Sequence, residues 1–262
     1  MEYQYIKYEA SDGVAWITLN RPEKRNPLSL DVETELMDAY DRCDYDESVR
    51  VVVIRGAGGN FSAGGDITVM KHRIDNGLRG ARENCRSHAT AMLRLRHIKK
   101  PVIAWVEGSA AGAGIPLALA CDFQIVSETA KCVFAFTNVG YVPDSGSTFF
   151  VTKAIGTVRA TELFMSARRF SGKEGASWGL FTEAVPDELL EERVMQYVEK
   201  YKKGPTFAYA GIKEMINRVQ YSGYADAILA EVDLQGRCEL TDDYRNAVTA
   251  FMAKEKPVYT GH

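Results

Sequence analysis

The stretch from Pro101 to Thr148 reads PVIAWVEGSAAGAGIPLALACDFQIVSETAKCVFAFTNVGYVPDSGST and decides the fold class. Its first part, Val102–Val106, is mainly β-branched and aromatic, which predicts a strand. The small residues at 108–114 predict a tight turn, and the apolar segment 115–121 predicts a helix. The first turn of a helix has unpaired N–H groups, which suit a developing negative charge. Close packing alone also explains such a turn, so both interpretations stay open.

Similar segments lie on both sides of this stretch. Downstream, residues 122–126 predict a strand, and Pro143–Ser147 predicts a second turn. Upstream, the apolar run Val51–Ile54 predicts a buried parallel strand, followed by the small-residue turn Phe61–Ile67 that opens into a helix. Repeated strand, turn and helix units predict an α/β fold. Neither a dinucleotide fingerprint nor a phosphate-binding loop of the G-x-x-x-x-G-K-[ST] type occurs.

The composition argues against several classes of protein. A chain of 262 residues allows one large domain, or a domain with a helical appendix. A net charge of -3 without a large basic patch argues against nucleic acid as the main partner. No apolar run reaches the length of about 18 residues that would predict a transmembrane helix. The polar N-terminus does not resemble a secretory signal peptide, so we expect a cytoplasmic protein that does not bind membranes.

The cysteines and histidines predict neither disulfides nor a metal site. The five cysteines are odd in number, and no C-x-x-C motif occurs. Free thiols in a reducing compartment are the simpler interpretation. The four histidines show no metal-ligand spacing such as H-E-x-x-H, so we expect no metal.

The N-terminal third can be assigned segment by segment. Residues 3–9 and 14–19 predict a hairpin that turns at Ser11-Asp12-Gly13. Ser29 is expected to cap a helix over residues 30–42. Residues 73–82 contain two glycines and four charges and predict a mobile segment, and residues 83–98 predict a helix.

The chain becomes mainly helical after Thr148. Helices are predicted over residues 157–167, 206–219 and 224–237. Two further helices each have one apolar face, formed by Leu190, Val194, Val198 and Tyr201 in the first and by Tyr244, Ala247, Val248 and Phe251 in the second. These faces need a surface to pack on, and we expect another subunit to supply part of it.

The two small-residue turns, in this order, resemble motifs of the crotonase (enoyl-CoA hydratase/isomerase) superfamily. Phe61–Ile67 is similar to the first oxyanion motif of the family, and Ala110–Gly114, leading to Leu119–Asp122, is similar to the second. Pro143–Gly146 lies where the family has its acid/base loop, and residues 176–185 resemble the family's A-x-x-x-G-L-V segment. The similarity spans nearly the whole chain, and the ordered combination is more specific than any single motif.

The resemblance implies an α/β fold of the crotonase type, a superhelix of ββα units with a C-terminal helical trimerisation region. We assign residues 1–200 to a CoA-thioester-binding core and 201–262 to a helical oligomerisation region. The family assembles as trimers, often paired into hexamers. The expected partners are therefore an acyl-CoA thioester and further copies of the chain, and coenzyme A enters as part of the substrate without a separate cofactor.

Matching by motif also assigns residues to the substrate. The amides of Gly65 and Ala113 fall on the two oxyanion donors, which are worth a few kcal/mol each when the thioester oxygen gains charge. Lys24 and Arg25 match the loop that holds the adenosine end of CoA, although a solvated basic loop explains them equally well. The other expected substrate contacts are Ala63, Asp66, Ile67, Phe136 and Lys213, the last beside the CoA of a neighbouring subunit. Phe61, Trp105 and Phe136 indicate either an aromatic pocket or core packing.

Departures from the family pattern bear on the reaction. Hydratases of the family use two glutamates, and alignment places Pro116 and Phe136 at those positions. Neither side chain titrates, so ordinary water addition is disfavoured. Asp144 resembles the single acid/base aspartate of the enoyl-CoA isomerases, including relatives that act on epoxyphenylacetyl-CoA. One carboxylate is enough to move a proton between two carbons of an enolate, so we predict an isomerase.

Four alternatives remain at this point. Asp144 can be only the cap of a helix that begins near Gly146. It can be the nucleophile of an aryl-CoA dehalogenase, a chemistry that also uses a histidine, and His88 is one residue out of register for that role. The chain can still be a hydratase-like lyase. It can also bind CoA thioesters without chemistry, although the retention of Asp144 argues against that.

Overall fold

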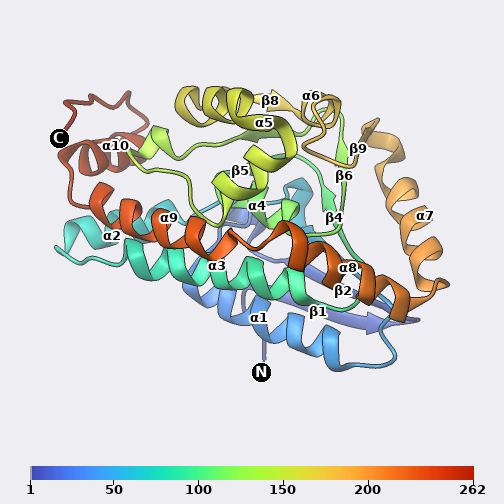
Figure 1. The fold of residues 1–262 in the computed structure, drawn as a ribbon. Helices are drawn as coiled ribbons and strands as arrows, with labels where there is room; N and C mark the ends of the chain where they lie inside the picture. The colour runs from blue at the N-terminus through green and yellow to red at the C-terminus, as the bar shows by residue number, and fades with distance from the viewer. Residues whose placement is uncertain (1) are drawn as a thin grey trace.

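The computed structural model describes residues 2–262, and its main element is a six-stranded sheet (Figure 1). The strand order is β1-β2-β3-β4-β6-β9. The first two strands are antiparallel, as the predicted hairpin requires, and the remaining neighbours are parallel. The strands are β1 (Ile6–Ser11), β2 (Val14–Leu19), β3 (Val51–Gly56), β4 (Val102–Val106), β6 (Phe123–Ser127) and β9 (Glu183–Val185).

A second, three-stranded sheet of order β5-β7-β8 stands beside the first. It consists of β5 (Ser109–Ala111), β7 (Lys131–Val133) and β8 (Phe170–Ser171). The sequence predicted residues 109–111 as part of a turn, and this was wrong. The segment is too short for a periodic signal, and parallel pairing with β7 gives it a strand conformation.

Ten α-helices and four short 3₁₀ helices surround the sheets in the described residues. The helices are α1 (Leu30–Tyr45), α2 (Ile67–Asp75), α3 (Ala81–His97), α4 (Gly114–Leu119), α5 (Ser147–Ser166), α6 (Gly172–Ser177), α7 (Leu190–Lys202), α8 (Thr206–Gln220), α9 (Tyr224–Cys238) and α10 (Asp242–Ala253). The 3₁₀ helices are η1 (Pro22–Lys24), η2 (Ala57–Gly59), η3 (Thr137–Val139) and η4 (Asp187–Leu189).

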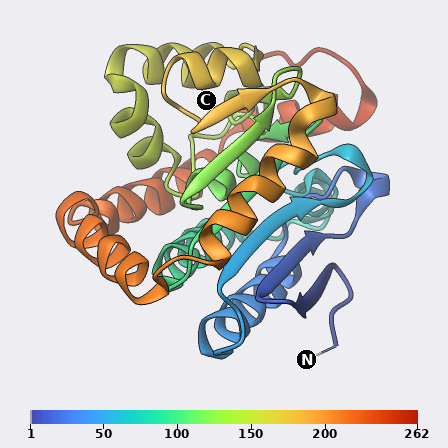
Figure 2. The same cartoon turned by 90° about the vertical axis from the view of Figure 1, so that its right-hand side faces the viewer.

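The six-stranded sheet is covered on both faces. Helix α7 lies across one face, where Leu190, Val194 and Val198 pack on alternate residues of β3 and β4 (Figure 2). Helices α1 and α3 belong to the other face, and α3 lies between α1 and α9 (Figure 1). Because strand residues alternate between faces, both sides of β3 are buried, which explains its continuous apolar run.

Helix boundaries confirm some predictions and correct others. The side chain of Ser29 caps α1 by accepting from the Val32 amide, as expected. The segment 73–82 is not one irregular stretch, because residues 73–75 belong to α2 and residues 81–82 to α3. Helix α5 begins at Ser147, ten residues earlier than predicted. The sequence signal is interrupted at Gly156, whose φ of 77° and ψ of 162° break the helix internally.

The C-terminal helices α8, α9 and α10 leave several apolar side chains in solvent. On α8 the exposed fractions are 94% for Phe207, 62% for Met215 and 71% for Val219. The division of the chain at residue 200 stays a prediction, and its first residue, Met1, lies outside the described residues. Across residues 2–262, none of the helices has the length and apolar character needed to cross a membrane.

Candidate active site

A cavity of about 380 Å³, called here the Asp144 cavity, collects nearly all of the predicted site residues. Its walls come from the turns after β3 and β5, from α3, from the segment before α5, and from α9 and α10. The predicted residues that line it are Lys24, Arg25, Ala63, Gly65, Asp66, Ile67, Ala113, Phe136 and Asp144. Lys213 is the exception.

The two small-residue turns are joined through their backbones. The Ser62 amide donates to the Ser109 carbonyl over 3.0 Å, and the Ala111 amide donates to the Ser62 carbonyl over 2.9 Å. Gly64 has a φ of 82°, and a Cβ atom there would lie 2.5 Å from the carbonyl oxygen of Ala111. Only glycine permits so close an approach in this conformation. Turns that are widely separated in the sequence therefore form one wall of the cavity.

This wall presents two free amides. In the part of the chain that the structure describes, the N–H groups of Gly65 and Ala113 have no hydrogen-bond acceptor. Unpaired amides beside a cavity are uncommon and need a partner from outside the chain. The N–H of Ala113 lies at the start of α4, where the helix dipole adds partial positive charge. The wall can therefore accept an oxygen that carries developing negative charge.

Asp144 lies in the same cavity, with its carboxyl group held on both sides. Oδ1 accepts from the Ser145 hydroxyl at 2.9 Å, and Oδ2 accepts from the Gln235 amide at 3.2 Å. Burial raises the pKa of Asp144 to about 7. The hydrogen bond from Ser145 opposes the shift, and the charge of Glu231 adds to it. A carboxyl group with a pKa near neutrality can both take up and release a proton at physiological pH.

The helix after Asp144 is capped by a different residue. Glu231 of α9 accepts hydrogen bonds from the amides of Gly146, at 2.8 Å, and Thr148, at 3.1 Å, at the start of α5. The side chain of Asp144 makes no bond of this kind, and only its backbone carbonyl accepts from Ser147. The interpretation of Asp144 as the helix cap is therefore wrong, because Glu231 occupies that position.

Asp66 also lines the cavity, but its carboxylate is already engaged. It caps α2 through the Thr68 amide at 3.0 Å and forms an ion pair with Arg21 at 2.8 Å. Burial works to raise the pKa of Asp66, but the hydrogen bonds from Thr68 and Arg21 outweigh it, so the pKa lies below its usual range. The residue is suited to fixing the turn, whereas a role in proton transfer would require it to give up these partners.

Comparison with known proteins identifies the family. The sequence model described as Enoyl-CoA hydratase/isomerase matches residues 9–262. The chain belongs to this family, the crotonase superfamily, and it is an enzyme.

Individual relatives cover the whole length of the chain. It is 31% identical to the trans-2-decenoyl-[acyl-carrier-protein] isomerase of Streptococcus mutans over 100% of both chains. It is 32% identical to the 1,2-epoxyphenylacetyl-CoA isomerase of Escherichia coli over 98% of this chain and 99% of the relative. A solved enoyl-CoA hydratase from Mycobacterium avium subsp. paratuberculosis superimposes with a TM-score of 0.90 at 32% identity, covering 99% of this chain and 100% of that one.

The crotonase positions that distinguish reactions have apolar side chains here. Pro116 is buried in the first turn of α4, and Phe136 is 6% exposed and lines the cavity. Of the other aromatic candidates, Phe61 is fully buried in the core, and Trp105 packs on the face of the sheet that α7 covers. Of the two interpretations left open by the sequence, core packing therefore holds for Phe61 and Trp105.

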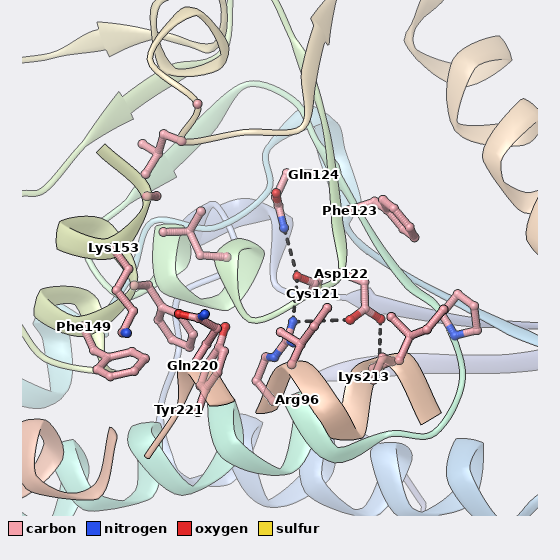
Figure 3. A pocket seen from close by; sticks show the side chains of 18 of the residues that line it. Arg96, Cys121, Asp122, Phe123, Gln124, Phe149, Lys153, Lys213, Gln220 and Tyr221 are labelled. Atoms are coloured by element: carbon pink, nitrogen blue, oxygen red, sulfur yellow. Dashed lines mark hydrogen bonds and ion pairs between the residues drawn. The ribbon is translucent and has the colours of Figure 1, made fainter. Parts of the chain in front are cut away.

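Lys213 lies in a separate cavity of about 570 Å³, called here the Lys213 cavity (Figure 3). Its ammonium contacts Asp122 at 2.6 Å and donates to the carbonyl of Lys100 at 2.8 Å. Arg96 approaches the same carboxylate at 3.3 Å, as the dashed lines in Figure 3 show. Lys213 is only 7% exposed, so the position of its ammonium does not support the predicted contact with CoA.

Sequence reasoning missed the residues that hold the site in place. Asn26 is buried, and its amide joins the Lys24 loop to the carbonyls of Ala57 and Asn60. Gln235 and Glu231 come from α9, more than 80 residues beyond the groups that they bind. The only available signal was a set of polar residues on an otherwise apolar helix face, which does not indicate a partner.

Proposed function

We propose that this enzyme moves a carbon–carbon double bond within an acyl thioester, with Asp144 as the proton-transferring residue. The thioester oxygen would bind the free amides of Gly65 and Ala113. Asp144 would remove a proton from one carbon of the acyl chain and return a proton two carbons away. The developing enolate charge would be stabilised by amides that are already in place, which is an effective form of transition-state stabilisation.

One observation carries this proposal: among the described residues, the Asp144 cavity combines two unpaired amides with one carboxyl group that has no cationic partner. Only Asp66 and Asp144 supply carboxyl groups to its described lining, and Asp66 is paired with Arg21. Water addition normally needs one group to activate water and a second to protonate carbon. The apolar side chains of Pro116 and Phe136 at the corresponding crotonase positions favour isomerisation over hydration.

The names of the relatives are consistent with this choice without deciding it. The Streptococcus mutans and Escherichia coli relatives are named isomerases, whereas a relative from Rhodobacter capsulatus at 33% identity is named a probable enoyl-CoA hydratase. The two isomerases also differ in their thioester carrier. We favour CoA, because Lys24 and Arg25 are exposed at the rim of the cavity, where they can meet its phosphates.

A second candidate is isomerisation of an aromatic acyl group, as the name of the Escherichia coli relative describes. The rings of Phe136 and Tyr141 line the cavity, with Phe251 of α10 beside them. The dehalogenase alternative is less well supported. Its nucleophile must be an ionised carboxylate, whereas burial favours the protonated form of Asp144.

The decisive experiment compares wild type with Asp144→Asn on 3-enoyl-CoA and 2-enoyl-CoA in deuterated water. Wild type should interconvert the two and incorporate deuterium at the α or γ carbon. The variant keeps the size of the side chain but cannot carry the proton, so turnover should fall by roughly 10²–10⁴-fold with little change in thioester affinity. Formation of hydroxyacyl-CoA that persists in the variant would refute both the reaction and the residue.

We also propose a trimer as the minimum assembly, because the exposed apolar residues of α8 need a covering surface. Light scattering at micromolar concentration should give three times the mass of one chain. A monomer under these conditions would contradict this proposal.

A further inference from the structure

The Asp144 cavity has a second titratable group that the proposed mechanism does not use. His88 of α3 lines the cavity, and its ring contacts the carboxylate of Glu33 on α1 through Nδ1. Both residues are buried, with exposed fractions of 4% for His88 and 0% for Glu33. A buried carboxylate that contacts an imidazole is costly unless the two groups share a proton. The buried contact between His88 and Glu33 therefore calls for an explanation.

The two ring nitrogens of His88 have different surroundings. Nδ1 of His88 and both carboxylate oxygens of Glu33 are sealed from solvent, and no hydrogen bond links them to any further described residue. Nε2 is not sealed in this way, and it belongs to a side chain that lines the cavity. If the Glu33 carboxylate keeps the imidazole hydrogen on Nδ1, the lone pair of Nε2 stays available to a ligand in the cavity.

His88 and Asp144 line the same cavity. Ala81, Asn84 and His88 line the cavity at a spacing that places them on one face of α3. The thiol of Cys85, on the preceding turn, lies close enough to Asp144 for the charge of that carboxylate to help raise the thiol pKa, although burial is the larger cause. His88 follows Cys85 by three residues, a rise of about 4.5 Å, so its imidazole lies one turn along α3 from that thiol.

The surroundings favour complementary proton states in the two groups. Burial raises the pKa of Asp144 to about 7, so this group holds its proton through much of the neutral range. Burial lowers the pKa of His88 to about 4, which favours the neutral imidazole at the same pH, whereas an ionised Glu33 beside the ring would act in the opposite direction. Environments that move two titratable groups of one cavity in opposite directions are typical of an acid and base pair.

We propose that His88 is a second catalytic residue of this cavity, which transfers one of the two protons through Nε2 while Asp144 transfers the other, and that Glu33 is a positioning residue for the imidazole. This inference rests on the isomerase function proposed above. It divides between two residues the proton transfer that Asp144 alone would otherwise perform.

The step balances without any further reactant. With a 3-enoyl thioester, Nε2 accepts the α proton, and the electron pair of that C–H bond forms the enolate on the amides of Gly65 and Ala113. As the thioester carbonyl re-forms, the double bond moves to the α and β carbons, and the γ carbon takes the proton of the Asp144 carboxylic acid. The imidazolium then returns its proton to the Asp144 carboxylate through solvent, which restores both groups.

The first test is the pH dependence of kcat/KM for a 3-enoyl-CoA substrate, which reports the free enzyme. With two groups, activity requires protonated Asp144 and neutral His88, so it should fall as pH rises above about 7. If Asp144 alone removes the α proton, activity should instead rise through the same pH. The other charged or titratable groups that face the pair or the cavity are Glu33, Cys85, Tyr141, Glu231, Asp66, Lys24, Arg25 and Arg73.

The second test uses substitution with a matched control. His88→Gln should lower kcat by about 10²–10³-fold with KM changed less than about threefold, and its residual activity should rise with pH. His97→Gln is the control, because His97 lies on the same helix but is exposed and bonded only to the carbonyl of Leu93. If His88→Ala folds as wild type does, added imidazole should restore part of its activity, which a purely structural role would not permit.

Three results would overturn the inference. One is wild-type turnover in His88→Gln. Another is failure of imidazole to rescue a folded His88→Ala enzyme. The third is a ¹⁵N spectrum that places the imidazole hydrogen on Nε2 in wild type and shows the same tautomer in Glu33→Gln. If wild type does not move the double bond at all, the isomerase function is refuted and the inference falls with it. Migration in wild type that does not depend on His88 refutes the inference alone, so the two failures are distinguishable.

Discussion

The two cavities of this enzyme differ in whether their charged groups are paired. In the Lys213 cavity, the carboxylate of Asp122 pairs with both Lys213, at 2.6 Å, and Arg96, at 3.3 Å. In the Asp144 cavity, two amides have no acceptor among residues 2–262, and a carboxyl group is shifted toward its protonated form. Unsatisfied polar groups are costly in a folded chain, so they persist mainly where a ligand completes them. Cavity volume alone would have favoured the Lys213 cavity, which is the larger of the two, over the Asp144 cavity.

The largest effect is expected when a charge is removed from the Lys213 cavity. Lys213→Met should lower the free energy of unfolding by roughly 3–5 kcal/mol, because Asp122 and the carbonyl of Lys100 lose a buried partner. Urea denaturation measures the change. Lys153→Met is the control in the same cavity, since Lys153 is exposed and only stacks on Phe149, and it should cost less than about 1 kcal/mol. Equal losses would show that the ion pairs are not the main stabilising feature.

The next test removes the buried acid from the other cavity. The pKa of Asp144 is raised from 3.8 to about 7 on folding, so its stabilising contribution is fully present below about pH 4 and is lost as pH rises to about 7. Asp144→Asn should therefore gain about 2–3 kcal/mol of stability relative to wild type between pH 5 and pH 8. Thermal unfolding at both values measures this gain. Asp226→Asn, an exposed control on α9, should show no such difference.

A smaller effect should follow from the residue that caps α5. The charge of Glu231 helps to keep the pKa of Asp144 high, while its oxygens bind the amides of Gly146 and Thr148. Glu231→Gln keeps an acceptor for the cap but removes the charge. The limb of the pH–rate profile that belongs to Asp144 should then move by up to about one unit toward lower pH. A profile that stays in place would mean that Glu231 is already neutral in the folded enzyme.

The smallest effect is expected at the rim of the Asp144 cavity. Lys24→Glu with Arg25→Glu should raise KM for an acyl-CoA by about five- to tenfold at low salt, and less at high salt, because these exposed side chains act through a screened field. An acyl-pantetheine thioester lacks the phosphates of CoA and is the matched control. If KM rises equally for both substrates, the loop acts through its shape and not through its charge.

Short-range patterns were sufficient for much of the architecture. The buried strand Val51–Ile54, the cap at Ser29 and the paired turns near Gly65 and Ala113 follow from runs of fewer than ten residues, and the structure contains each of them. Such features depend on local propensity, capping and turn chemistry, which neighbouring residues control. The strand Ser109–Ala111 was missed because its conformation depends on pairing with β7 and not on its own composition.

By itself, the sequence determined the α/β class, the family resemblance and the candidate residues, since these follow from local patterns and their order. Only the tertiary structure decided what those residues can do. It brought Glu231 and Gln235 of α9 to the Asp144 segment, engaged Asp66 with Arg21, and enclosed Lys213 with Asp122. The proton affinity of a carboxyl group depends on burial and on charges a few ångströms away, and folding alone determines which distant residues supply them.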